Sequence, residues 1–200
     1  MAFTALNSLL LTTDGRLFTW GAMHYCLGRT LSTPDKSLGI PVAGSNMKTG
    51  HMQAVDIGEI EEFSDLNSVV MVATGRSHVL ALDIKGRVWS WGTNDKGQLG
   101  HPMEDTSPKD KPCIIKKLKN IVQIYCGEYQ SFAVDTAGEI YAWGLNKNNC
   151  LLVNQLEIGL VKTIVHEPLQ IVLPEYFIGS NMTKMNVVQN NTGGFDFYSS

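Results

Sequence analysis

The sequence predicts an all-β fold built from repeated hairpins. A short pattern that ends in Trp-Gly occurs three times in the 200 residues, and apolar side chains alternate with other side chains on either side of it. Such alternation is typical of β-strands, and self-similarity along a chain is typical of repeat architectures. No amphipathic stretch has convincing helical length; the best candidate for a helix is residues 59–72.

The repeat is defined by the pairs Trp20-Gly21, Trp91-Gly92 and Trp143-Gly144, which are separated by 71 and 52 residues. A glycine stands five residues before each Trp, and a polar residue stands thirteen residues before it. The polar residues are Asn7, His78 and Gln130, so three different hydrogen-bonding side chains interchange at one position. This interchange favours a buried hydrogen-bonding role over titration or metal binding.

Each copy is predicted to be a β-hairpin. In the middle copy, Leu80 and Leu82 alternate in the first strand, and "DIKG" then forms a turn whose glycine takes a positive φ. In the second strand, Trp89 and Trp91 point to one face while Val88 and Ser90 point to the other. Because both sets are apolar or small, we expect both faces to be covered by neighbouring sheets.

Turn chemistry and a further strand follow each hairpin. "TNDKGQLG" requires positive φ near Gly97 and Gly100, and the third copy has Asn149 in place of Gly97. Asn is the best non-glycine residue for this conformation, so the turn can persist. We expect a further strand within 111–127, with Pro112 at its start, and another within 167–177.

The middle copy, "ATGRSHVLALDIKGRVWSWGTNDKGQLG" (73–100), resembles the repeat of the regulator of chromosome condensation family. The resemblance implies a β-propeller in which each repeat forms one four-stranded blade, and family members have seven blades. We expect one domain, 1–200, with repeats at about 4–28, 73–100 and 125–152 and a degenerate fourth start at 187–200. This is an incomplete arc of three to four blades, which further chain, a partner or self-association would complete.

The repeat assigns structural roles to particular residues, with aromatic side chains between blades and glycines in turns. The predicted structural positions are Gly15, Trp20, Gly21, Gly75, His78, Gly86, Trp91, Gly92, Gly97, Gly100, Gly127, Gly138, Trp143 and Gly144.

Catalytic and cofactor chemistry is not expected. "AGSNMKTG" (43–50) fails the phosphate-loop order, because Met47 precedes Lys48 where a glycine is required. No two of the five histidines lie three to five residues apart, and none of the four cysteines forms a CxxC pair. We therefore predict no enzyme, metal or cofactor, and reduced thiols in an intracellular protein of the cytoplasm or nucleus.

The net charge of −3 argues against a protein that mainly binds nucleic acid, and no apolar run is long enough to insert in a membrane. The favoured function is a non-catalytic protein-interaction module or scaffold. Two alternatives stay open, a guanine-nucleotide exchange factor for a small Ran-like GTPase, which only the resemblance implies, and a structural subunit of a large assembly. Loops 29–55 and 101–112 are the predicted binding segments. The candidate partner-binding residues are Glu104, Asp105, Lys109, Asp110 and Lys111.

Overall fold

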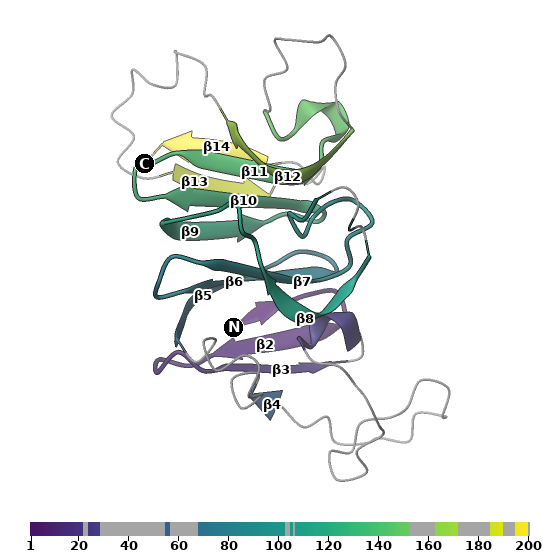
Figure 1. Ribbon diagram of the computed structural model, residues 1–200, viewed down its shortest axis with the longest axis vertical. Coiled ribbons are helices and arrows are strands. Elements are labelled where there is room, and N and C mark those ends of the chain that lie inside the picture. The colour runs from purple at the N-terminus through teal and green to yellow at the C-terminus, as the bar shows by residue number, and fades with distance from the viewer. Residues whose placement is uncertain are drawn as a thin grey trace.

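The chain folds into antiparallel sheets that stack one on another, as a computed structural model shows (Figure 1). The structure describes residues 1–21, 24–28, 55–56, 68–102, 105, 107–152, 163–171, 185–189 and 195–199. Three sheets have four strands each, and in every one the strands are neighbours in the order of the sequence. This up-and-down order is what repeated hairpins produce.

The three sheets correspond to the three copies of the repeat. The first contains β1 (Ala2–Phe3), β2 (Asn7–Leu11), β3 (Leu17–Gly21) and β4 (Val55–Asp56). The second contains β5 (Val69–Thr74), β6 (His78–Asp83), β7 (Val88–Gly92) and β8 (Lys109–Ile114). The third contains β9 (Ile121–Cys126), β10 (Gln130–Asp135), β11 (Ile140–Leu145) and β12 (Ile164–Ile171).

Short elements complete the described structure. Two 3₁₀ turns, η1 (His24–Cys26) and η4 (Lys147–Asn149), follow β3 and β11. Strands β13 (Met185–Gln189) and β14 (Phe195–Ser199) pair antiparallel over the segment predicted as a fourth repeat start, and Val187 pairs with Phe197. We propose that this hairpin is the beginning of a fourth blade.

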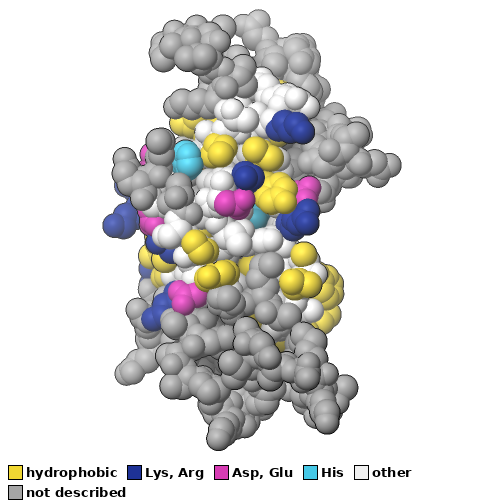
Figure 2. Space-filling model, turned by 90° about the vertical axis from the view of Figure 1, so that its right-hand side faces the viewer, with side chains coloured by type: hydrophobic (Ala, Val, Ile, Leu, Met, Phe, Trp, Pro, Cys, Tyr) yellow, Lys and Arg dark blue, Asp and Glu magenta, His cyan; other side chains and the backbone are white. Residues whose placement is uncertain are grey.

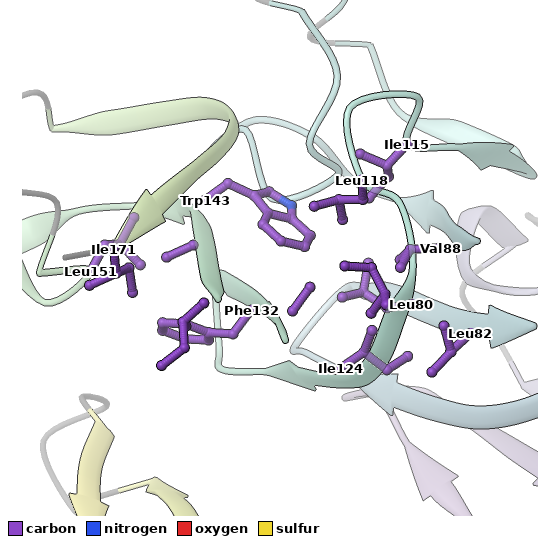
Figure 3. Packing of buried hydrophobic residues seen from close by; sticks show 14 of the residues in the cluster. Leu80, Leu82, Val88, Ile115, Leu118, Ile124, Phe132, Trp143, Leu151 and Ile171 are labelled. Carbon is purple, nitrogen blue, oxygen red and sulfur yellow. The ribbon is translucent and has the colours of Figure 1, made fainter. Parts of the chain in front are cut away.

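Both faces of the central sheet are buried, as the alternation predicted. Trp89 and Trp91 pack with Leu9 and Leu17 of the first sheet. Val88, from the same strand, packs on the other side, in the cluster that includes Trp143 of the third sheet (Figure 3). Because the two sets of side chains leave opposite faces of β7, one strand contributes to two separate cores.

The best candidate for a helix is a strand where the structure describes it, and one local prediction was wrong. Residues 69–72 are not helical but form the start of β5, because β-branched Val69, Val70 and Val72 suit a strand between neighbours. The segment 111–127 contains two strands, β8 and β9, and Pro112 lies inside β8 rather than at its start. The proline is tolerated there because the β7–β8 register shifts between Ser90 and Gly92, so that Lys109, Cys113 and Ile114 pair with β7 and Pro112 does not.

The turns use left-handed backbone where the sequence allows it. Gly86 has φ 74° and Gly97 has φ 70°, and Asn149, at the position of Gly97 in the third copy, has φ 57°. Leu152 occupies the position of Gly100 and has φ 50°. A branched side chain in this conformation is uncommon, so the fold of the third turn is maintained by its packing rather than by its local preference.

The stack has two ends with different connections. The loop face holds the connections from first to second strands, such as 75–77, and from third to fourth strands, such as 93–108. The turn face holds the tight hairpin turns, such as 84–87, and the connection 115–120 between blades. Figure 1 shows the loop face at the right and the turn face at the left. Of the two predicted binding loops, residues 29–54 lie outside the described residues, whereas the described part of 101–112 lies in the β7–β8 connection and in β8 itself.

Candidate interaction site

The predicted partner-binding residues lie in and beside the β7–β8 connection. Lys109, Asp110 and Lys111 are not in a loop, as predicted, but in strand β8, where all three are half-buried. Three apolar residues follow them in β8, which is an edge strand of the sheet: Pro112, Cys113 and Ile114. Glu104 lies outside the described residues.

Asp105 stabilises this connection through hydrogen bonds with residues of the connection and of β8. Its Oδ1 accepts hydrogen bonds from Lys109 Nζ at 2.7 Å and Ser107 Oγ at 2.9 Å, while its backbone carbonyl accepts from Asn94 Nδ2 at 2.7 Å. The bond from Lys109 is the main cause that lowers the pKa of Asp105, so the carboxylate stays charged at neutral pH. These charges hold the connection in shape, and they also place an ion pair on the loop face.

A groove of about 400 Å³ lies on the same face, across all three blades. It is formed by the ends of the first strands and the residues that follow them, which occupy equivalent positions in the three repeats. Its lining residues are Phe3, Thr4, Ala5, Thr74, Gly75, Arg76, Gly127 and Glu128. A pocket made from the same position in successive repeats is a product of stacking and is absent from any single repeat.

Backbone hydrogen bonds between blades give the groove a rigid floor. Ala5 N donates to Arg76 O at 2.9 Å, and Arg76 N donates to Glu128 O at 3.0 Å. The backbone N–H of the first repeat therefore donates to the second repeat, and that of the second to the third, at equivalent positions. Gly75 permits this approach, because a Cβ atom there would lie 2.6 Å from Gly127 O and closer still to the ring of His78.

Charged and apolar groups are both accessible in the groove. Arg76 and Glu128 form an ion pair at 2.6 Å, with 57% and 37% of their side chains exposed. The hydrogen bond that Arg76 donates to Glu128 raises the pKa of Arg76, and the guanidinium lies 6.0 Å from the centroid of the Tyr129 ring. Phe3, which lines the groove, is 61% exposed. Figure 2 views the loop face and shows charged side chains next to hydrophobic ones over the described blades.

One cluster of side chains has the residue types of a hydrolase active site, but a substrate cannot reach it. Ser90 Oγ lies 3.1 Å from His101 Nε2, and His101 is close enough to Asp105 for the carboxylate to influence its pKa. Ser90 is fully buried, however, and its hydroxyl donates to Leu99 O at 2.8 Å. A substrate cannot reach such a nucleophile, so this cluster stabilises the turn.

Nor do the described residues contain a group of three His, Cys, Asp or Glu side chains that could hold a metal ion. All four cysteines lie in the described part of the chain, and no disulfide joins any of them there. Within the described part of the chain no helix is long and apolar enough to cross a membrane.

The predicted Trp positions form bonds between blades. Trp91 Nε1 donates to Cys26 O at 3.1 Å, and Trp143 Nε1 donates to Gln98 O at 2.9 Å. In both cases the indole of one repeat donates a hydrogen bond to the turn that follows Trp-Gly in the preceding repeat. Trp20 of the first blade is half-buried.

The predicted glycines lie where chain segments meet or turn. Gly92 and Gly144 abut the backbone of the first-to-second strand connection in their own blades, and Gly100 lies against Trp143 of the next blade. Gly21 contacts Asn7 in the same way, and Gly127 presents the carbonyl that faces Gly75. The hairpin-turn glycines Gly15, Gly86 and Gly138 have φ between 74° and 85°.

Sequence reasoning missed two sets of polar residues. Asn94 Oδ1 and Asn146 Oδ1 accept from Leu99 N and Leu151 N, at 3.0 Å and 3.1 Å, and so close equivalent turns. Asp83 accepts from its own turn and from Trp89 Nε1 at 3.0 Å. The recurrence of Asn three residues after each of the last two Trp residues was a signal that could have revealed the first set.

The geometry defines a class of protein, an arc of β-propeller blades with an open groove on its loop face. Family models described as the regulator of chromosome condensation (RCC1) repeat match residues 85–134 in one form and residues 69–98 and 121–150 in another. The chain is therefore an RCC1-repeat protein, and the resemblance read from the sequence is confirmed.

Known proteins of the same kind extend beyond this chain. It is 31% identical over 175 residues to the protein RCC2 homolog of Xenopus laevis, a match that covers 86% of this chain and 30% of that protein. It is 32% identical over 142 residues to protein pim1 of Schizosaccharomyces pombe, which covers 68% of this chain and 22% of the relative. The chain thus spans less than a third of the length of these relatives.

Solved structures support the fold. The crystal structure of Prp20p from Saccharomyces cerevisiae, described together with its binding properties to Gsp1p and histones, superposes with a TM-score of 0.58 at 21% identity. The superposition covers 92% of this chain and 37% of that one. At this level of identity the likeness shows the shared propeller fold.

Proposed function

We propose that this chain is a non-catalytic interaction module that binds protein partners across its loop face. The groove between the three blades carries the proposal, because it combines a rigid floor with an exposed Phe3 and an exposed Arg76–Glu128 pair. Aromatic and Arg side chains are enriched where proteins bind one another. The β7–β8 connection with Asp105 and Lys109 opens on the same face and forms a second part of the proposed surface.

Reversing the charge of Arg76 should strongly weaken partner binding without unfolding the protein. An exposed ion pair contributes about 0–1 kcal/mol to stability, so Arg76→Glu leaves the fold intact but places two carboxylates side by side in the groove. We expect partners retained by the tagged chain from a lysate of its own source to fall at least fivefold with Arg76→Glu. Quantitative mass spectrometry of the retained proteins measures this.

The matched control is Lys147→Glu, which makes the same change of charge at an exposed lysine outside the groove. It should retain the partners that Arg76→Glu loses. Equal retention by both variants would place the binding surface elsewhere, and equal loss would show a general effect of charge.

The second candidate is guanine-nucleotide exchange on a small GTPase, favoured by the structural likeness to Prp20p. An exchange factor binds the nucleotide-free GTPase more tightly than the loaded form. The same capture, performed with EDTA in one arm and with GDP and magnesium in the other, separates the two functions. A GTPase enriched only with EDTA supports exchange, whereas partners indifferent to nucleotide support the interaction module.

The third candidate, a structural subunit, predicts a different behaviour of the isolated chain. An arc that is completed by copies of itself would run as a defined oligomer in light scattering at micromolar concentration. We place the protein inside the cell, in the cytoplasm or nucleus, with proteins rather than nucleic acids as partners. The four described cysteines form no disulfide, which agrees with a reducing compartment.

A further inference from the structure

The turn face, opposite the groove, carries a cationic segment. The connection 115–120 between β8 and β9 reads "IKKLKN" and exposes Lys116, Lys117 and Lys119. Among the described residues, none of the ion pairs involves these three lysines. Three like charges within four residues repel one another, and a negatively charged ligand would relieve that repulsion.

The segment is held rigidly in place. Ile115 and Leu118 are 1% and 5% exposed and anchor it in the core between the second and third blades, where Figure 3 shows both near Trp143. Backbone bonds fix both ends, since Ile115 N donates to Val88 O at 2.9 Å and Ile121 N donates to Gly86 O at 3.1 Å. A preorganised backbone reduces the entropy lost on binding.

Neighbouring carboxylates on the turn face already have other partners. Asp83 is 2% exposed and pairs with Arg87 at 2.6 Å. Asp135 Oδ1 accepts from Ala137 N at 2.9 Å and Glu139 N at 3.0 Å within its own turn. Glu139 accepts a hydrogen bond from Gln170. Among the described residues, none of these acids forms an ion pair with the three lysines.

An exposed apolar side chain lies in the adjacent turn. Ile84 is 71% exposed at the tip of the β6–β7 turn, and Gly86 of the same turn contacts the end of the lysine connection, because Ile121 N bonds to Gly86 O. Neither 84–87 nor 115–120 contains an aromatic residue on which a base could stack. Charge together with an isoleucine fits a polypeptide better than a nucleic acid.

We propose that Ile84, Lys116, Lys117 and Lys119 form a second binding surface, which takes an acidic protein segment with an apolar residue among its carboxylates. The module then has two faces, with the groove on one and this acidic-segment site on the other, and it can hold two partners at once.

The test measures binding of a fluorescent peptide, Glu-Glu-Leu-Glu-Glu-Leu-Glu-Glu, by anisotropy at low salt. Lys116→Glu/Lys117→Glu should weaken binding at least tenfold, and Ile84→Ser at least threefold. The control Lys96→Glu/Lys147→Glu changes the net charge equally on the loop face and should leave affinity within twofold. Raising the salt concentration should weaken binding by the unchanged protein, because the contacts are exposed.

Three results would overturn the proposal. The first is equal weakening by both double variants, which would mean that only net charge matters. The second is no effect of Ile84→Ser together with equal affinity for a Glu-Glu-Ser-Glu-Glu-Ser-Glu-Glu peptide. The third is tighter binding of single-stranded DNA or of vesicles with anionic lipids than of the peptide. Circular dichroism of each variant verifies that it is folded.

Discussion

Replacing Trp143 by alanine is expected to lower the free energy of unfolding by about 3–5 kcal/mol. The indole is fully buried between the second and third blades, and its Nε1 donates to Gln98 O at 2.9 Å. The truncation therefore leaves a cavity and removes a bond between blades. Denaturant unfolding monitored by circular dichroism measures the loss.

Trp20→Ala is the matched control, because Trp20 occupies the same repeat position but is only half-buried. It should lose less than half as much stability as Trp143→Ala. Trp143→Phe retains most of the volume and separates the hydrogen bond from packing, with an expected loss of about 1–2 kcal/mol. Equal losses for Trp20→Ala and Trp143→Ala would show that contact between blades does not stabilise this fold.

Acid should destabilise the protein between about pH 6.5 and pH 4, with a contribution of about 3 kcal/mol from His78. Burial lowers the pKa of His78 to about 4. The unfolded chain, with an ordinary histidine pKa near 6.5, binds the proton more readily, so stability is full above that pH and falls as the pH decreases. Denaturant unfolding at a series of pH values measures the slope.

The environment of His78 explains why protonation of its imidazole ring is unfavourable. Its Nε2 lies 3.0 Å from Ser131 Oγ, whose hydroxyl donates to Gln98 O at 2.8 Å. The Ser131 oxygen can then accept from a neutral Nε2–H. Nδ1 is buried and has no hydrogen-bond partner among the described residues. A proton on Nδ1 would place an unsolvated charge between two blades.

His78→Gln tests this explanation with a residue that the fold already uses, since Gln130 occupies the same position in the third repeat. His78→Gln should lose most of the dependence of the free energy of unfolding on pH between about pH 6.5 and pH 4. A residual slope is expected from His101, because burial lowers its pKa as well. An unchanged slope in His78→Gln would assign the acid sensitivity to other groups.

Much of the fold was predictable because it depends on local patterns. The opposite directions of Trp89 and Val88, the positive φ of Gly86 and the left-handed Asn149 all follow from alternation and turn chemistry within one repeat. Pattern reasoning failed at Pro112, because a register shift between neighbouring strands accommodates it. Such a shift is a property of strand pairing and has no signature within the strand itself.

The candidate sites were less predictable. Sequence reasoning selected charged residues near one another in the chain, and Asp105 and Lys109 prove to be bonded to each other. The groove instead joins Phe3, Arg76 and Glu128, which are separated by 73 and 52 residues in sequence. Their proximity follows from the stacking of equivalent loops.

The sequence by itself determined the repeat, the hairpins, the turn positions and the two-sided burial, because period and backbone preference are encoded within each copy. Only the tertiary structure decided which equivalent positions meet, how His78 is enclosed and which lysines are exposed together on the turn face. These depend on how one blade packs against the next, and that packing brings together atoms that no local pattern relates.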